Sequence, residues 1–190
     1  MKNYKKIKNK NQKKNRVIEI INKMEKFFNR NRTLMPLLLM LTFVSCDEKR
    51  VFDDYQSIPK NKWNKNQKIS FSFTVKDTIS SNNLFINIRN SNAYPFNNLF
   101  LITALSFPNG QKIIDTLEYE MADVTGRFLG NGFTEIKENK LFYKENVQFP
   151  VIGTYTIEIA QAMRKNGEIT GVFFLEGITD VGFRVEKTNK

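Results

Sequence analysis

Over several short segments between residues 69 and 186, apolar and polar side chains alternate with a period of two. In the first, residues 69–75, apolar residues take every odd position: Ile69, Phe71, Phe73 and Val75. Successive side chains of a β-strand point to opposite faces, so this period predicts a strand with one buried face. The alternation is repeated in five later segments: 84–88, 113–121, 141–147, 154–160 and 181–186.

Residues 99–107 are apolar on both faces, which predicts a strand in the centre of a sheet. Pro108-Asn109-Gly110 follows directly, and Asn-Gly between apolar runs is a strong hairpin signal. A second turn is predicted at residues 165–168, and no long helical period follows residue 45. About seven or eight short strands are typical of an antiparallel β-sandwich. We therefore predict one all-β sandwich over residues 69–187, with jelly-roll-like or immunoglobulin-like topology.

The net charge of +11 would by itself suggest a nucleic-acid partner. However, residues 1–23 hold nine Lys and Arg residues and a single acid, whereas residues 46–190 hold 18 bases and 17 acids. The near-neutral remainder predicts no nucleic-acid partner. Basic runs such as residues 1–23 are normally disordered or lie outside the packed domain.

His is absent from the chain, and there is one Cys. These counts exclude a Ser-His-Asp triad, an imidazole general base, a His-ligated metal and a disulfide within one chain. We expect no enzyme activity, no cofactor and no metal.

Residues 34–44 form an uncharged apolar run that is too short to span a membrane but has the length of a signal-peptide h-region. Ser45-Cys46 follows it directly. A small residue before a Cys at this place resembles a bacterial lipobox, in which the Cys is acylated and becomes the first residue of the mature protein. The sequence therefore predicts cleavage between Ser45 and Cys46, and a bilayer as the partner of the acylated Cys46.

Residues 1–23 leave two interpretations open. A translation start at Met24 would give a signal peptide of ordinary size over residues 24–45, with residues 1–23 not translated. Alternatively, apolar residues at helical spacing make residues 16–28 a basic amphipathic surface helix. We favour the later start, because signal n-regions are short.

Residues 46–68 are polar and charged, with a Pro at position 59, and predict a tether. Within it, residues 51–55 could form a short edge strand. The only Trp, Trp63, is interpreted first as a core anchor where the chain enters the domain, since large apolar groups are mostly buried.

Three sets of side chains are candidates for chemistry. Glu118 and Glu120 share one strand face and could act as an acid–base pair, although a solvated outer face explains them better. A calcium site is the second candidate, formed by the hard oxygens of Asp123, Thr125 and Asn131, but it lacks EF-hand spacing. The Gly-rich residues 126–132 match no phosphate-binding motif and predict a loop or bulge.

Several segments, in order, resemble the gliding-motility lipoprotein GldH family of the Bacteroidota. They are Tyr94-Pro-Phe-Asn-Asn-Leu-Phe100, Phe107-Pro-Asn-Gly110, Asp115 to Asp123, Gly126-Arg-Phe-Leu-Gly130, Phe149 to Tyr155, Gln161 to Arg164 and Gly177 to Glu186. The resemblance covers residues 46–187. It implies an acylated envelope protein that is needed for gliding and linked to type IX secretion, with other gliding-machinery proteins as partners and no catalytic residues. The implied location is a membrane of the cell envelope, the outer rather than the inner.

Two alternatives to this structural or assembly role stay open. A carbohydrate-binding surface lipoprotein would present Trp63, Tyr94 and Phe96 as exposed ligand contacts, so burial of these side chains would exclude it. A hydrolase would need a pocket that joins Glu118 and Glu120.

Overall fold

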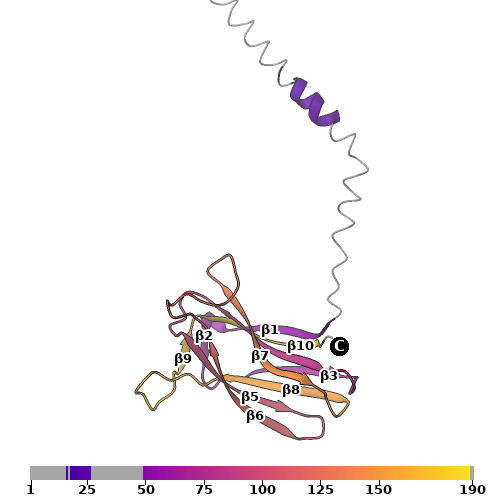
Figure 1. Ribbon diagram of the computed structural model, residues 1–190. Coiled ribbons are helices and arrows are strands. Elements are labelled where there is room, and N and C mark those ends of the chain that lie inside the picture. Colours follow the sequence, from indigo (N-terminus) through magenta and orange to yellow (C-terminus); the bar gives the residue numbers. More distant parts are fainter. Residues whose placement is uncertain (1–15, 17, 27–48, 189–190) are drawn as a thin grey trace, which may run out of the picture. The chain divides into compact units, whose positions relative to one another are not determined.

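The computed structural model describes residues 16, 18–26 and 49–188 (Figure 1). The chain divides into two compact units, residues 1–47 and 48–190. In the first, residues 16 and 18–26 are helical. This agrees with the helix of the alternative for residues 16–28, of which residues 17, 27 and 28 lie outside the described part of the chain. None of the helices in the described residues is long and apolar enough to cross a membrane. The predicted h-region, Ser45 and Cys46 lie outside the described residues.

The second unit is built from antiparallel strands in two four-stranded sheets and one two-stranded sheet (Figure 1). The first sheet has the order β1-β10-β4-β7, the second β3-β8-β5-β6, and the small sheet pairs β2 with β9. The bounds are β1 Arg50–Ser57, β2 Lys62–Asn64, β3 Ile69–Val75, β4 Asn82–Asn90, β5 Asn98–Ser106, β6 Lys112–Glu120, β7 Lys137–Val147, β8 Gly153–Gln161, β9 Phe174–Glu176 and β10 Ile178–Lys187.

The two large sheets confirm the predicted antiparallel β-sandwich. Leaving aside the short β2 and β9, the chain passes from sheet to sheet in the strand order of a jelly roll, so this alternative holds and the immunoglobulin-like one does not. The central position of β5 is confirmed, because it pairs with both β6 and β8. The hairpin at Pro108–Gly110 is confirmed as well: the Gly110 N–H donates to the Phe107 carbonyl at 3.0 Å.

The core lies between the two large sheets and is rich in aromatic rings. Phe183 of β10 lies 5.6 Å from Phe73 and 6.4 Å from Phe71, both in β3 of the opposite sheet, between ring centroids. The alternating residues of 69–75 are buried at every odd position, as the sequence predicts. Burying a Phe side chain stabilises the fold by about 1.5–3 kcal/mol, so these rings help to hold the two sheets together.

The tether predicted over residues 46–68 is wrong from residue 50 onward. Strand β1 extends the expected edge strand to Arg50–Ser57 and pairs with β10 along its length. A 3-10 turn over Pro59–Asn61 leads into β2, where Trp63 is fully buried and donates its indole N–H to the Gln67 carbonyl at 3.0 Å. Trp63 is thus a core residue, and the folded domain begins close to residue 48.

Candidate functional site

The chain enters the sandwich beside the end of β10. The Lys187 N–H donates to the Lys49 carbonyl at 2.8 Å, and Arg50 pairs with Glu186 in the β1–β10 ladder. This hydrogen bonding ties the chain to β10 from Lys49 onward, three residues after Cys46 in the sequence. The tether between the predicted acylation site and the domain is therefore much shorter than the sequence suggested.

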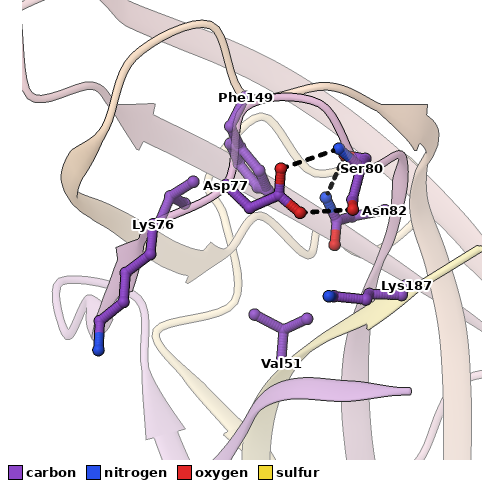
Figure 2. Close-up of a pocket in the computed structure, with 8 residues that line it drawn as sticks. Val51, Lys76, Asp77, Ser80, Asn82, Phe149 and Lys187 are labelled. Atoms are coloured by element: carbon purple, nitrogen blue, oxygen red, sulfur yellow. Dashed lines mark hydrogen bonds between the residues drawn. The ribbon is translucent and has the colours of Figure 1, made fainter. Parts of the chain in front are cut away.

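A cavity of about 180 Å³ opens at this end of the sandwich (Figure 2). Its lining comes from β1, the end of β3, the β3–β4 loop, the start of β4, the β7–β8 loop and the end of β10: Val51, Val75, Lys76, Asp77, Ser80, Asn82, Phe149 and Lys187. Phe149 and Val75 are buried members of the core. Figure 2 shows Val51 and Lys187 on the side of the cavity away from the Asp77 turn, while the Lys76 side chain points away.

Asp77 holds the β3–β4 loop in shape. Its carboxylate accepts hydrogen bonds from the Ser80 hydroxyl and from the backbone N–H groups of Ile79 and Ser80 (Figure 2). The Ser80 hydroxyl, with these two backbone donors, lowers the pKa of Asp77 to about 2. The carboxylate is therefore ionised and engaged with its own loop, which suits a structural turn and not an acid catalyst.

The three aromatic residues proposed as ligand contacts do not form an exposed platform. Trp63 and Tyr94 are buried, and Phe96 is partly buried against the core. The Tyr94 hydroxyl donates to the Asn98 carbonyl at 2.6 Å, and its ring lies 6.0 Å from Phe96. Burial of Trp63 and Tyr94 removes two of the three exposed ligand contacts on which the carbohydrate-binding alternative depends.

Tyr94 also brings together two of the segments that carry the family resemblance, residues 94–100 and 126–130. The Tyr94 ring lies 6.3 Å from that of Phe128, which belongs to the Gly126–Gly130 segment. A groove of about 790 Å³ runs along this segment and is bordered by Asn92 and Lys137. The sequence predicted a loop here, and the β-bridge between Ala122 and Phe128 gives it a local turn.

Two of the three candidate calcium ligands, Asp123 and Thr125, hydrogen-bond to each other within the same loop. Asp123 accepts hydrogen bonds from the Thr125 hydroxyl at 2.6 Å, the Thr125 N–H at 2.9 Å and the Arg127 N–H at 3.1 Å. The Thr125 hydroxyl and these backbone donors hold the pKa of Asp123 below its usual value. Across the described residues, no group of three His, Cys, Asp or Glu side chains is placed to hold a metal.

Glu118 and Glu120 are exposed on the outer face of β6. Glu118 accepts a hydrogen bond from Asn98 at 2.9 Å, and neither carboxylate lines the cavity or the groove described above. The interpretation of these residues as a solvated face therefore agrees with their positions.

Ion pairs that sequence reasoning missed cross the outer face of the first sheet. Arg184 of β10 donates to Asp53 of β1 at 2.7 Å, and Lys140 of β7 lies 2.8 Å from Glu186 of β10. Arg184 and Glu186 occupy alternate positions of a strand, a pattern that predicts side chains on the outward face. Asp53, however, lies in the segment that the sequence analysis assigned to the tether. The pairing could not be expected, because Asp53 and Arg184 are 131 positions apart.

A second group on this face centres on Tyr55. Its hydroxyl donates to Glu138 at 2.9 Å, and the Arg89 guanidinium lies 4.2 Å from the centre of its ring. Burial, helped by Glu138, raises the pKa of Tyr55 to about 12. The ring lies over Gly182, where a Cβ atom would come within 2.7 Å of it. This glycine makes room for the Tyr55 ring on the sheet surface.

Among solved structures, the sandwich is similar to a family GH115 4-O-methyl-α-glucuronidase, with a TM-score of 0.40, 14% identity, and coverage of 76% of this chain and 18% of that one. It is also similar to the VP2 subviral particle of infectious bursal disease virus, with a TM-score of 0.35, 17% identity, and coverage of 75% and 34%. Likenesses this weak carry no argument about function.

Sequence comparison gives a much closer match. Residues 50–185 match the model of the GldH lipoprotein family. The chain is 51% identical over 158 residues to "Gliding motility lipoprotein GldH" of Flavobacterium johnsoniae, covering 83% of this chain and 97% of the relative. It is equally identical over 153 residues to the "Gliding motility lipoprotein GldH homolog" of Christiangramia forsetii, covering 80% and 93%. The chain therefore belongs to the GldH lipoprotein family.

Proposed function

We propose that this chain is a structural or assembly component of the cell-envelope machinery for gliding and type IX secretion, anchored to a membrane through acylated Cys46. The observation that carries the proposal is the 51% identity to a gliding motility lipoprotein over 97% of that relative's length. The family name gives a lipoprotein and a role in gliding; the assembly role and the link to secretion are our extension.

The side chains of the described domain favour a structural role over catalysis. Its perturbed carboxylates are each engaged: Asp77 and Asp123 with their own loops, and Asp115, Glu158 and Glu186 with lysine side chains. A general acid or base needs a group that is free to exchange a proton with a substrate. These carboxylates instead fix loops and join strands.

Acylation would supply the attachment. A bacterial lipoprotein Cys carries more than one acyl chain, and two or more chains hold a protein stably on a bilayer, whereas a single chain does so only marginally. We place the protein in the outer membrane, facing the periplasm or the cell surface, with neighbouring gliding proteins as its partners.

The test is complementation of a gliding bacterium that lacks the gene. The wild-type gene should restore cell movement, export of surface adhesins and recovery of the protein in the outer-membrane fraction. Cys46→Ser should leave an unacylated precursor and restore neither movement nor export. Thr42→Ser, within the apolar run, is the matched control and should behave like wild type.

Crosslinking of the membrane-extracted protein tests the partners. Recovery of other gliding or secretion proteins from wild-type cells, and their loss with Cys46→Ser, is the expected result. Unaffected type IX secretion in a gene deletion that no longer glides would contradict the link to secretion.

A further inference from the structure

The end of the sandwich at which the chain enters, here called the anchor-proximal end, consists of the start of β1, the end of β10, the β3–β4 loop, the β7–β8 loop and the β5–β6 hairpin. Strand registers place these parts together. Asn82 pairs with both Lys187 and Val147, and Val75 pairs with Gly153. A Cβ atom on Gly153 would lie 2.9 Å from Pro108 of the hairpin.

Apolar side chains project from this end. Ile79 in the β3–β4 loop is 79% exposed, Ile152 in the β7–β8 loop is 63% exposed and Val51 at the start of β1 is 42% exposed. The Gln148 side chain donates to the Ile79 carbonyl at 3.3 Å and so links the two loops. Since Asp77 also fixes the β3–β4 loop, Ile79 is held outward by a defined turn.

Basic side chains accompany them. Arg50, Lys76 and Lys187 are exposed at this end. The acids at this end are Asp77, Glu145 and Glu186. The Asp77 carboxylate already accepts the hydrogen bonds of its own loop, and Glu186 pairs with Lys140 and Arg184. Apolar side chains next to exposed lysines are the composition of segments that lie in the headgroup region of an anionic bilayer.

The short segment between Cys46 and β1 limits how far this end can lie from the membrane. Arg50 lies four residues after Cys46, and four extended residues span at most about 14 Å. If Cys46 is acylated, as the proposed function requires, the start of β1 cannot move farther than this from the lipid. Such a short connection leaves the anchor-proximal end facing the bilayer.

We propose that the anchor-proximal end rests directly on the bilayer that holds Cys46, with Ile79 and Ile152 among the lipid headgroups and Lys76 and Lys187 facing anionic phosphates. The inference rests on the proposed lipid anchor and goes beyond it, because it assigns a membrane-contacting surface to the folded domain itself. The opposite end is then presented to partners.

The opposite end supplies matched controls. Val124 and Ile169 are also exposed, in the loops that follow β6 and β8. Gln161 pairs with Leu101 at the end of β8, away from Gly153 and hence away from the anchor-proximal end. A site that contacted the membrane only because it is apolar would behave in the same way at both ends.

The experiment uses the acylated protein in vesicles of phosphatidylethanolamine and phosphatidylglycerol. Acylation blocks the thiol of Cys46, so Ile79→Cys, Ile152→Cys, Val124→Cys and Ile169→Cys each offer one thiol for a polarity-sensitive fluorophore. Labels at positions 79 and 152 should be quenched by lipid-borne quenchers and shielded from iodide. Labels at positions 124 and 169 should be quenched by iodide and should not be quenched by lipid-borne quenchers. Equal iodide quenching at all four positions in vesicle-bound protein would overturn the inference and leave the anchor intact.

Charge reversal provides a second measurement. The double variant Lys76→Glu with Lys187→Glu should reduce lipid quenching at position 79 in anionic vesicles. The ratio of domains that contact the bilayer to domains that do not should fall about five-fold or more for each lysine replaced. Lys165→Glu, in the loop after β8, should have no effect. Unchanged quenching in the double variant would exclude the anionic-phosphate contact. A protein that is neither acylated nor vesicle-bound would contradict the proposed function, and with it this inference.

Discussion

The Tyr119 hydroxyl of β6 donates a hydrogen bond of 2.6 Å to the Phe142 carbonyl of β7. Both strands are edges of their sheets, so this bond joins the two layers along one open side of the sandwich. Burial raises the pKa of Tyr119 to about 12, which keeps the donor protonated at any physiological pH. A backbone carbonyl at a sheet edge is thereby paired within the chain.

Replacing Tyr119 by Phe should lower the free energy of unfolding by about 1 kcal/mol, because the Phe142 carbonyl loses its donor while the ring remains. Urea denaturation of the two proteins measures the difference. Glu120→Gln, on the exposed face of the same strand, is the control and should leave the midpoint unchanged. An equal loss in both variants would mean that the bond across the two sheets contributes nothing of its own.

The second link across this side should depend on pH. Burial alone would raise the pKa of Asp115, but Lys144 and Tyr143, at 2.9 and 2.8 Å, hold it below its usual value. A carboxylate with a lowered pKa stabilises the fold above its unfolded-state pKa, and this stability is lost as the pH falls through the folded-state value. Asp115→Asn should therefore be less stable than wild type at neutral pH and nearly as stable in acid.

Denaturation midpoints measured from neutral to acid pH test the link. Lys144→Met should likewise be less stable than wild type at neutral pH, because the Asp115 carboxylate then keeps only the Tyr143 donor. A stability difference that stays constant from neutral to acid pH would mean that the Asp115 charge is not the stabilising group.

Gly177 should tolerate no side chain. It has a φ of +82° and lies between β9 and β10, where a Cβ atom would come within 2.2 Å of the Tyr94 backbone nitrogen. Gly167 has a similar φ of +79° with nothing near it. Gly167→Ala should lower the free energy of unfolding by about 1 kcal/mol from the backbone conformation alone, and Gly177→Ala by roughly 3 kcal/mol or more.

Thermal or urea unfolding of the two glycine variants separates steric contact from backbone strain, because only the contact differs between the sites. If both variants lose equal stability, the close approach of Gly177 to Tyr94 is relieved elsewhere in the fold at little free-energy cost.

Translation is expected to begin at Met24. A start there gives a signal peptide of ordinary size over residues 24–45, because signal n-regions are short. Met24→Leu should abolish the precursor in cells, whereas Met1→Leu should leave its amount and size unchanged. Mass spectrometry of the precursor, with signal cleavage blocked, reads its first residue directly. A peptide from residues 1–23 in that precursor would contradict the prediction.

The alternation of apolar and polar residues predicts most of the strands, because it is a local property that is visible within seven or nine residues. Strands β1 and β2 were not recognised as parts of the domain, because their partners β10 and β9 lie more than a hundred residues away and their apolar residues are sparse. The choice of jelly roll over immunoglobulin-like topology depends on these same distant pairings, which alternation does not encode.

The roles of the candidate site residues could not be predicted from local sequence alone. Trp63, Tyr94 and Phe96 are amphipathic or aromatic types that suit either a ligand platform or a core, and only the tertiary fold decides between them. The signal for Cys46 is local and complete in sequence, yet the residue lies outside the described part of the chain. The exposed Ile79 and Ile152 carried no sequence signal, because a single apolar residue in a loop is common.

Strand β1 is the first strand of the described domain and is held to β10 by a ladder from Arg50 to Ser57. Traction applied through a lipid anchor and resisted at the far loops would pull this strand along its own axis. The ladder would then be loaded in shear, with its hydrogen bonds sharing the force together instead of opening one after another. Such an attachment would suit the role in gliding that we propose.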